Sequence, residues 1–163
     1  MLKIDVTAAL DHPGERYAFS LQESPVDWES PLGVAFLGDI SFSGEYWSEK
    51  GSVYITGKVA ATVDAQCSRC LAPVEYPLLL SVEGKFARQE DIENDVYEMA
   101  GKQLFLDRFI LDEISLALPS QYLCSSDCKG LCPKCGVNRN FEQCDCDVSS
   151  NGLNPFEKLK GLF

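Results

Sequence analysis

The chain of 163 residues is 45% hydrophobic, which is enough apolar material for one compact domain with an attached tail. Its net charge of −11 lies in residues 1–119, where 20 Asp and Glu stand against 9 Lys and Arg, whereas residues 120–163 hold 5 of each. Proteins that grip phosphate backbones need clustered basic residues, so the acidic body is predicted not to bind nucleic acid. No apolar run is long enough to cross a bilayer, and Asp5 interrupts the place where a secretory signal needs an uncharged core. We therefore expect a cytoplasmic protein without membrane contact.

Period-two alternation of apolar and polar residues predicts three strands, at residues 34–46, 53–65 and 74–86. Weaker alternation predicts further strands at residues 2–9 and 16–22. Each of the three strong segments follows the previous one after only a few residues. Because such short connections join antiparallel neighbours, these segments predict an antiparallel meander.

The pattern changes after the third strand. Residues 90–98 hold five acids and no base, which indicates a solvated loop or, alternatively, a docking surface for a basic partner. Between residues 104 and 118 apolar side chains recur at steps of three and four, which predicts an amphipathic helix that covers the apolar face of the sheet. Pro119 should end this helix. A last short helix is expected at residues 155–162, packed back onto the body.

Eight cysteines are the candidate functional residues, and they fall as four close pairs. The pairs are Cys67–Cys70, Cys124–Cys128, Cys132–Cys135 and Cys144–Cys146. Cytosolic thiols stay reduced, so close pairs are more typical of metal ligands than of disulfides. Two pairs of thiolates complete a tetrahedron around zinc, so four pairs predict two zinc ions, each held by four cysteines. A single zinc, iron in place of zinc, and disulfide or redox pairing are the alternatives.

The spacing of the pairs favours one division between two sites. The zinc-ribbon-type knuckle Cys132–Gly136 has the pair Cys144–Cys146 as its nearest downstream partners. The pair Cys67–Cys70 would then meet Cys124–Cys128, although Cys128 and Cys132 could exchange roles. The tail has few large apolar residues, whereas a structural zinc contributes roughly 10–16 kcal/mol in apparent terms. Metal, and not hydrophobic packing, is therefore expected to decide whether the tail folds.

These signals together predict an α+β fold: a mainly antiparallel β meander covered by one amphipathic helix, with a zinc-knuckle C-terminal extension. Residues 1–119 are expected to form an acidic antiparallel β domain with the core helix 104–118. Residues 120–163 are expected to form a Cys-rich metal-binding extension with the short C-terminal helix, packed on the first part.

No catalytic constellation is present in the sequence. The single histidine, His12, lies beside Pro13 in an expected loop, and neither a Gly-rich phosphate loop nor a nucleophile elbow occurs. A thioredoxin-type Cys-x-x-Cys lies at the N-terminus of a helix, whereas Cys67–Cys70 lies between two predicted antiparallel strands. The sequence therefore predicts a protein that is not an enzyme.

The motifs as a set resemble the YceD family, also called the large ribosomal RNA subunit accumulation proteins. The residues that carry the resemblance are Cys67-Ser-Arg-Cys70-Leu71, Leu116-Ala117-Leu118-Pro119, the run from Cys124 to Gly136 with Lys129-Gly130-Leu131 between its cysteine pairs, Asn138, Asn140, Cys144, Cys146, Asn154-Pro155-Phe156 and Leu159. The resemblance covers about residues 30–163. Arg139 departs from it, because members often carry leucine at this position.

The resemblance implies a small bacterial or plastid protein that is needed for normal levels of large-subunit ribosomal RNA. It also implies metal-binding residues at the positions of Cys67, Cys70, Cys124 and Cys128. We expect a non-enzymatic ribosome biogenesis factor whose acidic body binds a basic large-subunit ribosomal protein or a pre-ribosomal particle. Two alternatives stay open: direct RNA contact by the tail through Lys129, Lys134 and Arg139, and a thiol-based redox switch.

Overall fold

The computed structural model describes residues 1–25, 33–88 and 96–146. Its N-terminal elements are β1 (Lys3–Asp5), α1 (Thr7–Asp11) and β2 (Tyr17–Glu23). The central elements are β3 (Ala35–Phe36), β4 (Ile40–Glu49), β5 (Ser52–Gln66) and β6 (Pro73–Ala87). They are followed by β7 (Val96–Ala100), β8 (Gln103–Phe105) and α2 (Asp107–Ala117). In the described ranges no helix is both long and apolar enough to cross a membrane.

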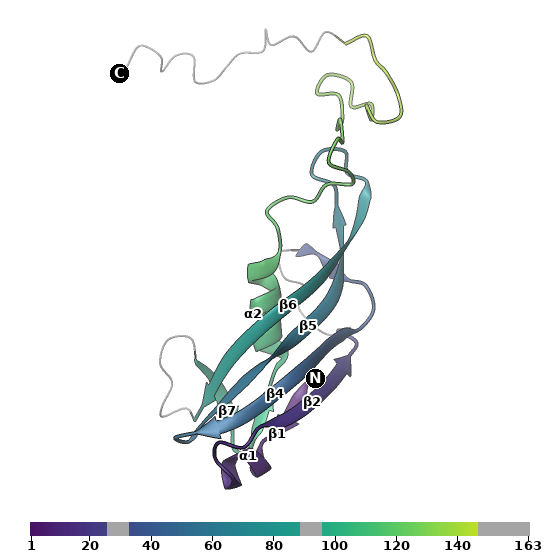
Figure 1. The fold of residues 1–163 in the computed structure, drawn as a ribbon. Coiled ribbons are helices and arrows are strands. Elements are labelled where there is room, and N and C mark those ends of the chain that lie inside the picture. The colour runs from purple at the N-terminus through teal and green to yellow at the C-terminus, as the bar shows by residue number, and fades with distance from the viewer. Residues whose placement is uncertain (26–32, 89–95, 147–163) are drawn as a thin grey trace, which may run out of the picture.

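The strands form one sheet in the order β1-β8-β7-β6-β5-β4-β2, with β3 added beside β5. All described pairings are antiparallel apart from the parallel pair β6–β7. The sheet curls into a half-barrel, and α2 lies beside its long central strands (Figure 1). The hairpin of β5 and β6 extends beyond the other strands and carries the cysteine-rich tail at its tip (Figure 1).

This architecture shows that the predicted fold class was wrong. Among the described residues, 47% are in strands and 13% are helical, so this part of the chain is mainly β, and a curled half-barrel with two helices replaces a meander covered by one helix. The physical reason is that segments distant in sequence complete the sheet: β1 pairs with β8, and β2 pairs with β4. The helix that the sequence did not predict is α1, which contacts β4. There the Ser48 hydroxyl donates a hydrogen bond to the Ala9 carbonyl.

The individual segments agree with the sequence to different degrees. The three strong strand segments are found as β4, β5 and β6, with β3 at the start of the first. The predicted helix begins later than residue 104, because Leu104 belongs to β8 and the Leu106 N–H bonds the Leu2 carbonyl. The helix ends at Ala117, as the following proline predicted. Residues 96–98 of the acidic segment begin β7, and the helix expected at 155–162 lies outside the described residues.

Phe109 of α2 is the centre of the hydrophobic core. Its ring is fully buried and lies 6.1 Å from the ring of Phe42, 5.7 Å from Phe86 and 5.2 Å from Tyr97. Ile110 and Ile114 on the same helix are also fully buried. Because β4, β6 and β7 each supply one of these aromatic rings, α2 packs against three different strands of the curled sheet and holds them together.

β4 and β5 approach each other closely at a pair of glycines. Gly44 lies opposite Gly57, and a Cβ added at Gly44 would overlap the backbone oxygen of Thr56. Glycine in a strand interior often marks such a bend. We infer that glycine at this point lets the sheet turn tightly enough to enclose α2.

Gly44→Ala is expected to destabilise the fold by about 1–3 kcal/mol, because the new methyl group meets backbone and not a flexible side chain. For a chain of this size, this corresponds to a fall in Tm of several degrees. Ser43→Ala is the matched control, since Ser43 is the exposed neighbour on the same strand. Thermal unfolding of the metal-loaded protein measures both. An unchanged Tm for Gly44→Ala would show that the curl does not depend on this glycine.

Candidate metal centres

The first cysteine cluster joins the middle of the chain to its tail. Cys67 and Cys70 lie in the turn at the tip of the β5–β6 hairpin, and Cys124 and Cys128 come from the segment after α2. The sulfurs of Cys67 and Cys128 are 3.8 Å apart, and those of Cys70 and Cys124 are 3.5 Å apart. All four sulfurs lie within 4.8 Å of one another. The partition expected from the spacing is therefore present in the geometry.

These sulfur separations fit a tetrahedral metal ion. Zn–S bonds of about 2.3 Å set neighbouring sulfurs about 3.8 Å apart in a tetrahedron. A disulfide would require an S–S distance of about 2.05 Å, and all eight cysteines are free. Three of the four candidate ligands, Cys67, Cys70 and Cys128, are buried, and Cys124 is exposed. This mostly buried set of soft sulfurs would suit zinc or iron.

The second cluster is local to the tail. Cys132, Cys135, Cys144 and Cys146 also place their sulfurs within 4.8 Å of one another. Only Cys132 of this cluster is buried, and Cys135 is exposed. The second cluster is therefore more accessible to solvent than the first.

The two Cys-x-x-Cys turns share one backbone geometry. In each, the residue after the second cysteine donates its N–H to the carbonyl of the first: Leu71 to Cys67 at 2.9 Å, and Gly136 to Cys132 at 2.8 Å. Both residues have positive φ, 61° at Leu71 and 76° at Gly136. Glycine adopts this region readily, whereas a leucine pays a steric penalty there. Gly136 therefore suits its turn, whereas the strained Leu71 is a feature that the spacing did not reveal.

Backbone contacts dock the tail onto the hairpin tip. The Ser68 N–H donates to the Tyr122 carbonyl at 2.8 Å, and the Leu131 N–H donates to the Arg69 carbonyl at 3.0 Å. The Arg69 guanidinium in turn donates to the Cys128 carbonyl at 2.9 Å. The two residues between Cys67 and Cys70 therefore hold both ends of the segment that supplies the remaining ligands. The motif that carries the family resemblance includes Arg69, but nothing in the sequence predicted these contacts.

Asn140 links the two clusters. Its side-chain amide donates to the sulfur of Cys128 at 3.3 Å, and its oxygen accepts the N–H of Lys129 at 2.7 Å. The same amide donates to Asn138 Oδ1 at 2.9 Å. Partners of this kind orient metal ligands and tune their basicity. A residue in the loop of the second cluster thus supports a ligand of the first.

Hydrogen bonding divides the thiols into more and less acidic ones. Backbone N–H groups, that of Cys124 foremost, point at the Cys67 sulfur and lower the pKa of this thiol to about 6. The N–H of Cys135 has the same effect on Cys132, whose pKa is also lowered to about 6. Conversely, hydrogen bonding to the Cys128 sulfur raises the pKa of the Cys124 thiol to about 12. Four neighbouring thiolates repel one another, so full ionisation of such a cluster requires a bound cation.

The part of the chain that holds the two cysteine clusters is also the part that matches known proteins. The model of a protein family described as large ribosomal RNA subunit accumulation protein YceD matches residues 55–163. The chain belongs to the YceD family. The match includes most of β5, all of β6, and all eight cysteines.

Curated relatives of this YceD chain include bacterial and plant proteins. It is 35% identical over 107 residues to an uncharacterized protein of Mycobacterium tuberculosis. The aligned residues are 62% of this chain and 51% of the relative. It is 34% identical over 61 residues to a protein of Arabidopsis thaliana named large ribosomal RNA subunit accumulation protein YCED homolog 1, chloroplastic, with 36% of this chain and 19% of the relative aligned. A maize protein of the same name is 36% identical over 69 residues, which are 41% of this chain and 22% of the relative. The chain spans about half the length of the mycobacterial relatives, and no solved structure matches it.

Single cysteine substitutions should remove the metal ions from this YceD protein one at a time. The wild-type chain is expected to bind two ions, and Cys70→Ser or Cys135→Ser should each leave one, because each substitution removes one of four ligands from a different cluster. Elemental analysis of protein purified without chelator gives the metal content and identity. Loss of both ions in both variants would contradict two independent sites.

Asn140→Asp is expected to weaken metal binding at the first cluster by about 10- to 100-fold. The substitution replaces the amide that donates to the Cys128 sulfur with a carboxylate, which adds a negative charge beside the thiolates. Competition with a metal chelator measures this loss. Gln143→Glu makes the same charge change at an exposed position nearby and should have little effect. Equal losses in the two variants would mean that charge alone, and not this hydrogen bond, matters.

Proposed function

We propose that this chain is a non-enzymatic ribosome biogenesis factor that supports accumulation of large-subunit ribosomal RNA by binding a basic ribosomal protein. Membership of the YceD family supports the link to ribosomal RNA, and the names of the plant relatives state it for those proteins. The observation that carries the mode of action is the charge distribution: −11 in residues 1–119 and zero in residues 120–163. An acidic body attracts a basic protein and repels RNA.

Electrostatics would act here mainly on the rate of encounter. Complementary charges speed association and weaken as salt rises, because the Debye length is about 10 Å at 0.1 M salt. On the outer face of the sheet Asp64 of β5 lies directly opposite Glu75 of β6, and both side chains are exposed. Like charges directly opposite each other destabilise a sheet. A basic partner that binds beside Asp64 and Glu75 would relieve the repulsion between these two carboxylates.

The proposed role of the metal ions is structural. Each cluster would hold one zinc ion, with iron as the alternative, through Cys67, Cys70, Cys124 and Cys128 in the first and Cys132, Cys135, Cys144 and Cys146 in the second. Such an ion supplies cross-linking and charge neutralisation, and the chain supplies the ligands and the hydrogen bonds that orient them. Residues 120–163 would then form an extension fixed to the 1–119 body. We propose a cytoplasmic location, and we assign no catalytic role to His12, which is exposed.

RNA contact by the tail is the second candidate function. Lys129, Lys134 and Arg139 are all exposed, and the Phe141 side chain is 84% exposed beside them in sequence. Basic side chains neutralise phosphates, and an exposed aromatic ring offers a surface on which a base can stack. The tail would then contact RNA while the acidic body holds a protein. Oxidation of the thiols with loss of metal remains a third reading of the same clusters.

Charge reversal separates the first two candidates. Reversing the charge of the acidic pair on the body with Asp64→Lys and Glu75→Lys should weaken binding to a basic large-subunit ribosomal protein by about 1–2 kcal/mol at low salt. The same variant should make the binding less dependent on salt. The matched variant reverses the charge of the tail with Lys129→Glu, Lys134→Glu and Arg139→Glu. Titration calorimetry at several salt concentrations, with ribosomal proteins and ribosomal RNA fragments as separate ligands, measures both.

The protein-binding role predicts that only the body variant loses affinity for the ribosomal protein. Loss of association with pre-ribosomal particles in the tail variant alone would favour direct RNA contact. Tight binding of wild-type protein to RNA fragments, without binding to any ribosomal protein, would end the first proposal.

A further inference from the structure

One edge of the long strand β6 is open. β6 pairs with β5 along almost its whole length, from Pro73 to Phe86. On its other side it pairs with β7 only at residues 85–87. Within the described parts of the chain, residues 73–84 have no strand beside this second edge. An unpaired edge of this length is a template for another strand.

The backbone groups that face the open edge can be identified from the prolines. Proline has no N–H, and in sheets it occupies positions that face an unpaired edge. In a strand the backbone N–H and C=O groups of every second residue point toward the same edge. Pro73 and Pro77 of β6 are separated from Leu79, Ser81 and Glu83 by even numbers of residues, so all five belong to one such set. Leu79, Ser81 and Glu83 therefore direct their N–H and C=O groups toward the open edge. They offer three donors and three acceptors in a row.

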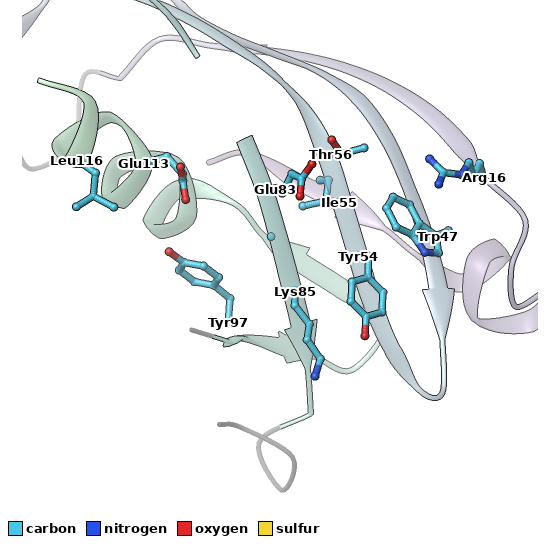
Figure 2. A pocket seen from close by; sticks show the side chains of 11 residues that line it. Arg16, Trp47, Tyr54, Ile55, Thr56, Glu83, Lys85, Tyr97, Glu113 and Leu116 are labelled. Atoms are coloured by element: carbon cyan, nitrogen blue, oxygen red, sulfur yellow. The ribbon is translucent and has the colours of Figure 1, made fainter. Parts of the chain in front are cut away.

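A groove crosses this edge, and its lining combines charged and apolar side chains. The groove has a volume of about 610 Å³ and is lined by Glu83 and Lys85 on β6 and by Tyr97, Glu113 and Leu116 across the edge. Figure 2 shows β6 passing between Tyr97, Glu113 and Leu116 on one side and Tyr54 on the other. Leu116 of α2 is 83% exposed, and Leu79 on the open edge of β6 is 73% exposed.

The charges beside the groove favour a basic occupant. Glu83 on β6 and Glu113 on α2 face each other across the groove, whereas the Lys85 side chain points away from both (Figure 2). Asp112 precedes Glu113 on the same helix and accepts a hydrogen bond from Tyr97 at 3.2 Å. Burial and the neighbouring Asp112 raise the pKa of the Glu113 carboxyl, and a cation placed between the walls would favour its ionised form. At the far end of the groove Arg16 is held by Glu45 at 3.3 Å and by the Trp47 ring at 4.2 Å. That arginine is thus engaged within the chain.

We propose that the open edge of β6 from Leu79 to Glu83 binds an extended basic segment of a protein partner as an added strand. Main-chain hydrogen bonds to Leu79, Ser81 and Glu83 would supply affinity, as in other cases of strand addition. Basic side chains would meet Glu83 and Glu113, and apolar ones would cover Leu79 and Leu116. A second copy of this chain is a poor occupant, because both copies carry −11. This inference rests on the proposed function and names the contact through which the basic protein is held.

Amide hydrogen exchange on the full, metal-loaded chain tests this directly. The probe is a 12-residue peptide of alternating lysine and valine, and the control peptide replaces alternate valines with proline so that it cannot form a ladder. Adding the probe should slow exchange at Leu79, Ser81 and Glu83 by at least about tenfold, as expected for newly bonded N–H groups. The control peptide should leave their exchange unchanged. Equal protection by both peptides, or none by either, overturns the proposal.

Ser81→Pro and Ser81→Ala form a matched pair of variants. Proline removes one edge donor at a position equivalent to Pro77, which the same strand already accommodates, whereas alanine keeps the N–H. The proline variant should lose at least about tenfold in affinity for the probe, and the alanine variant should stay within about twofold. If Ser81→Pro does not fold, Glu83→Lys keeps the backbone intact and should weaken binding through charge. Unchanged affinity in the folded variants overturns the proposal.

The outcomes separate this inference from the function on which it rests. If a basic ribosomal protein binds and the Ser81→Pro variant binds it equally well, the edge is not the contact although the function stands. If no ribosomal protein binds but the peptide still protects the edge, the edge is a binding site and the proposed function is wrong. Protection of these N–H groups that rises with protein concentration in the absence of peptide, together with dimers in light scattering, would assign the edge to a second copy and overturn the proposal.

Discussion

The attachment of the tail to the body depends on the meeting of four sulfurs at the tip of the β5–β6 hairpin. The contacts between Cys67 and Cys128 and between Cys70 and Cys124 span 61 and 54 residues of sequence. Few other side chains could hold this arrangement, since the apolar groups around it are small or half-buried, and Phe141 is 84% exposed. A bound ion would therefore replace the hydrophobic core that this end of the molecule lacks. The hydrogen bonds of Arg69 and Asn140 then serve to orient ligands as well as to dock the tail.

The molecule thus has two centres of stability with different chemistry. In the body, Phe109 packs against rings from three strands, and the curl of the sheet at Gly44 makes this enclosure possible. At the hairpin tip, Cys67, Cys70 and Cys128 form a separate buried cluster. The long strands β5 and β6 join the two centres. Loss of metal should consequently release the tail from the hairpin and leave the curled sheet folded.

The sequence predicts those features that depend on local periodicity or on ligand type. Residues 53–65 and 74–86 alternate because one face of each strand is buried, and the cysteine pairs are recognisable because few other roles require two thiols at such close spacing. The pairing of β1 with β8 and the parallel contact of β6 with β7 were not predictable, since they depend on contacts between distant segments and leave no period in the sequence. Leu104 was assigned to the helix because short apolar patterns fit a strand end and a helix start equally well. The supporting contacts of Arg69 were invisible for a similar reason: its spacing is not distinctive.

The family match begins inside β5 and includes β6, α2 and all eight cysteines, but it does not include β1, β2 or β4. The elements on which the proposals rest, namely the metal ligands, the outer face of the hairpin and the open edge of β6, therefore lie mostly within the matched residues. The N-terminal residues supply the rest of the sheet, including Phe42, whose ring contacts Phe109. One contribution of these residues is therefore to enclose α2 from the side of β4. Arg16 and Trp47 also line the far end of the groove beside β6, so the N-terminal part shapes the proposed binding site as well as packing on α2.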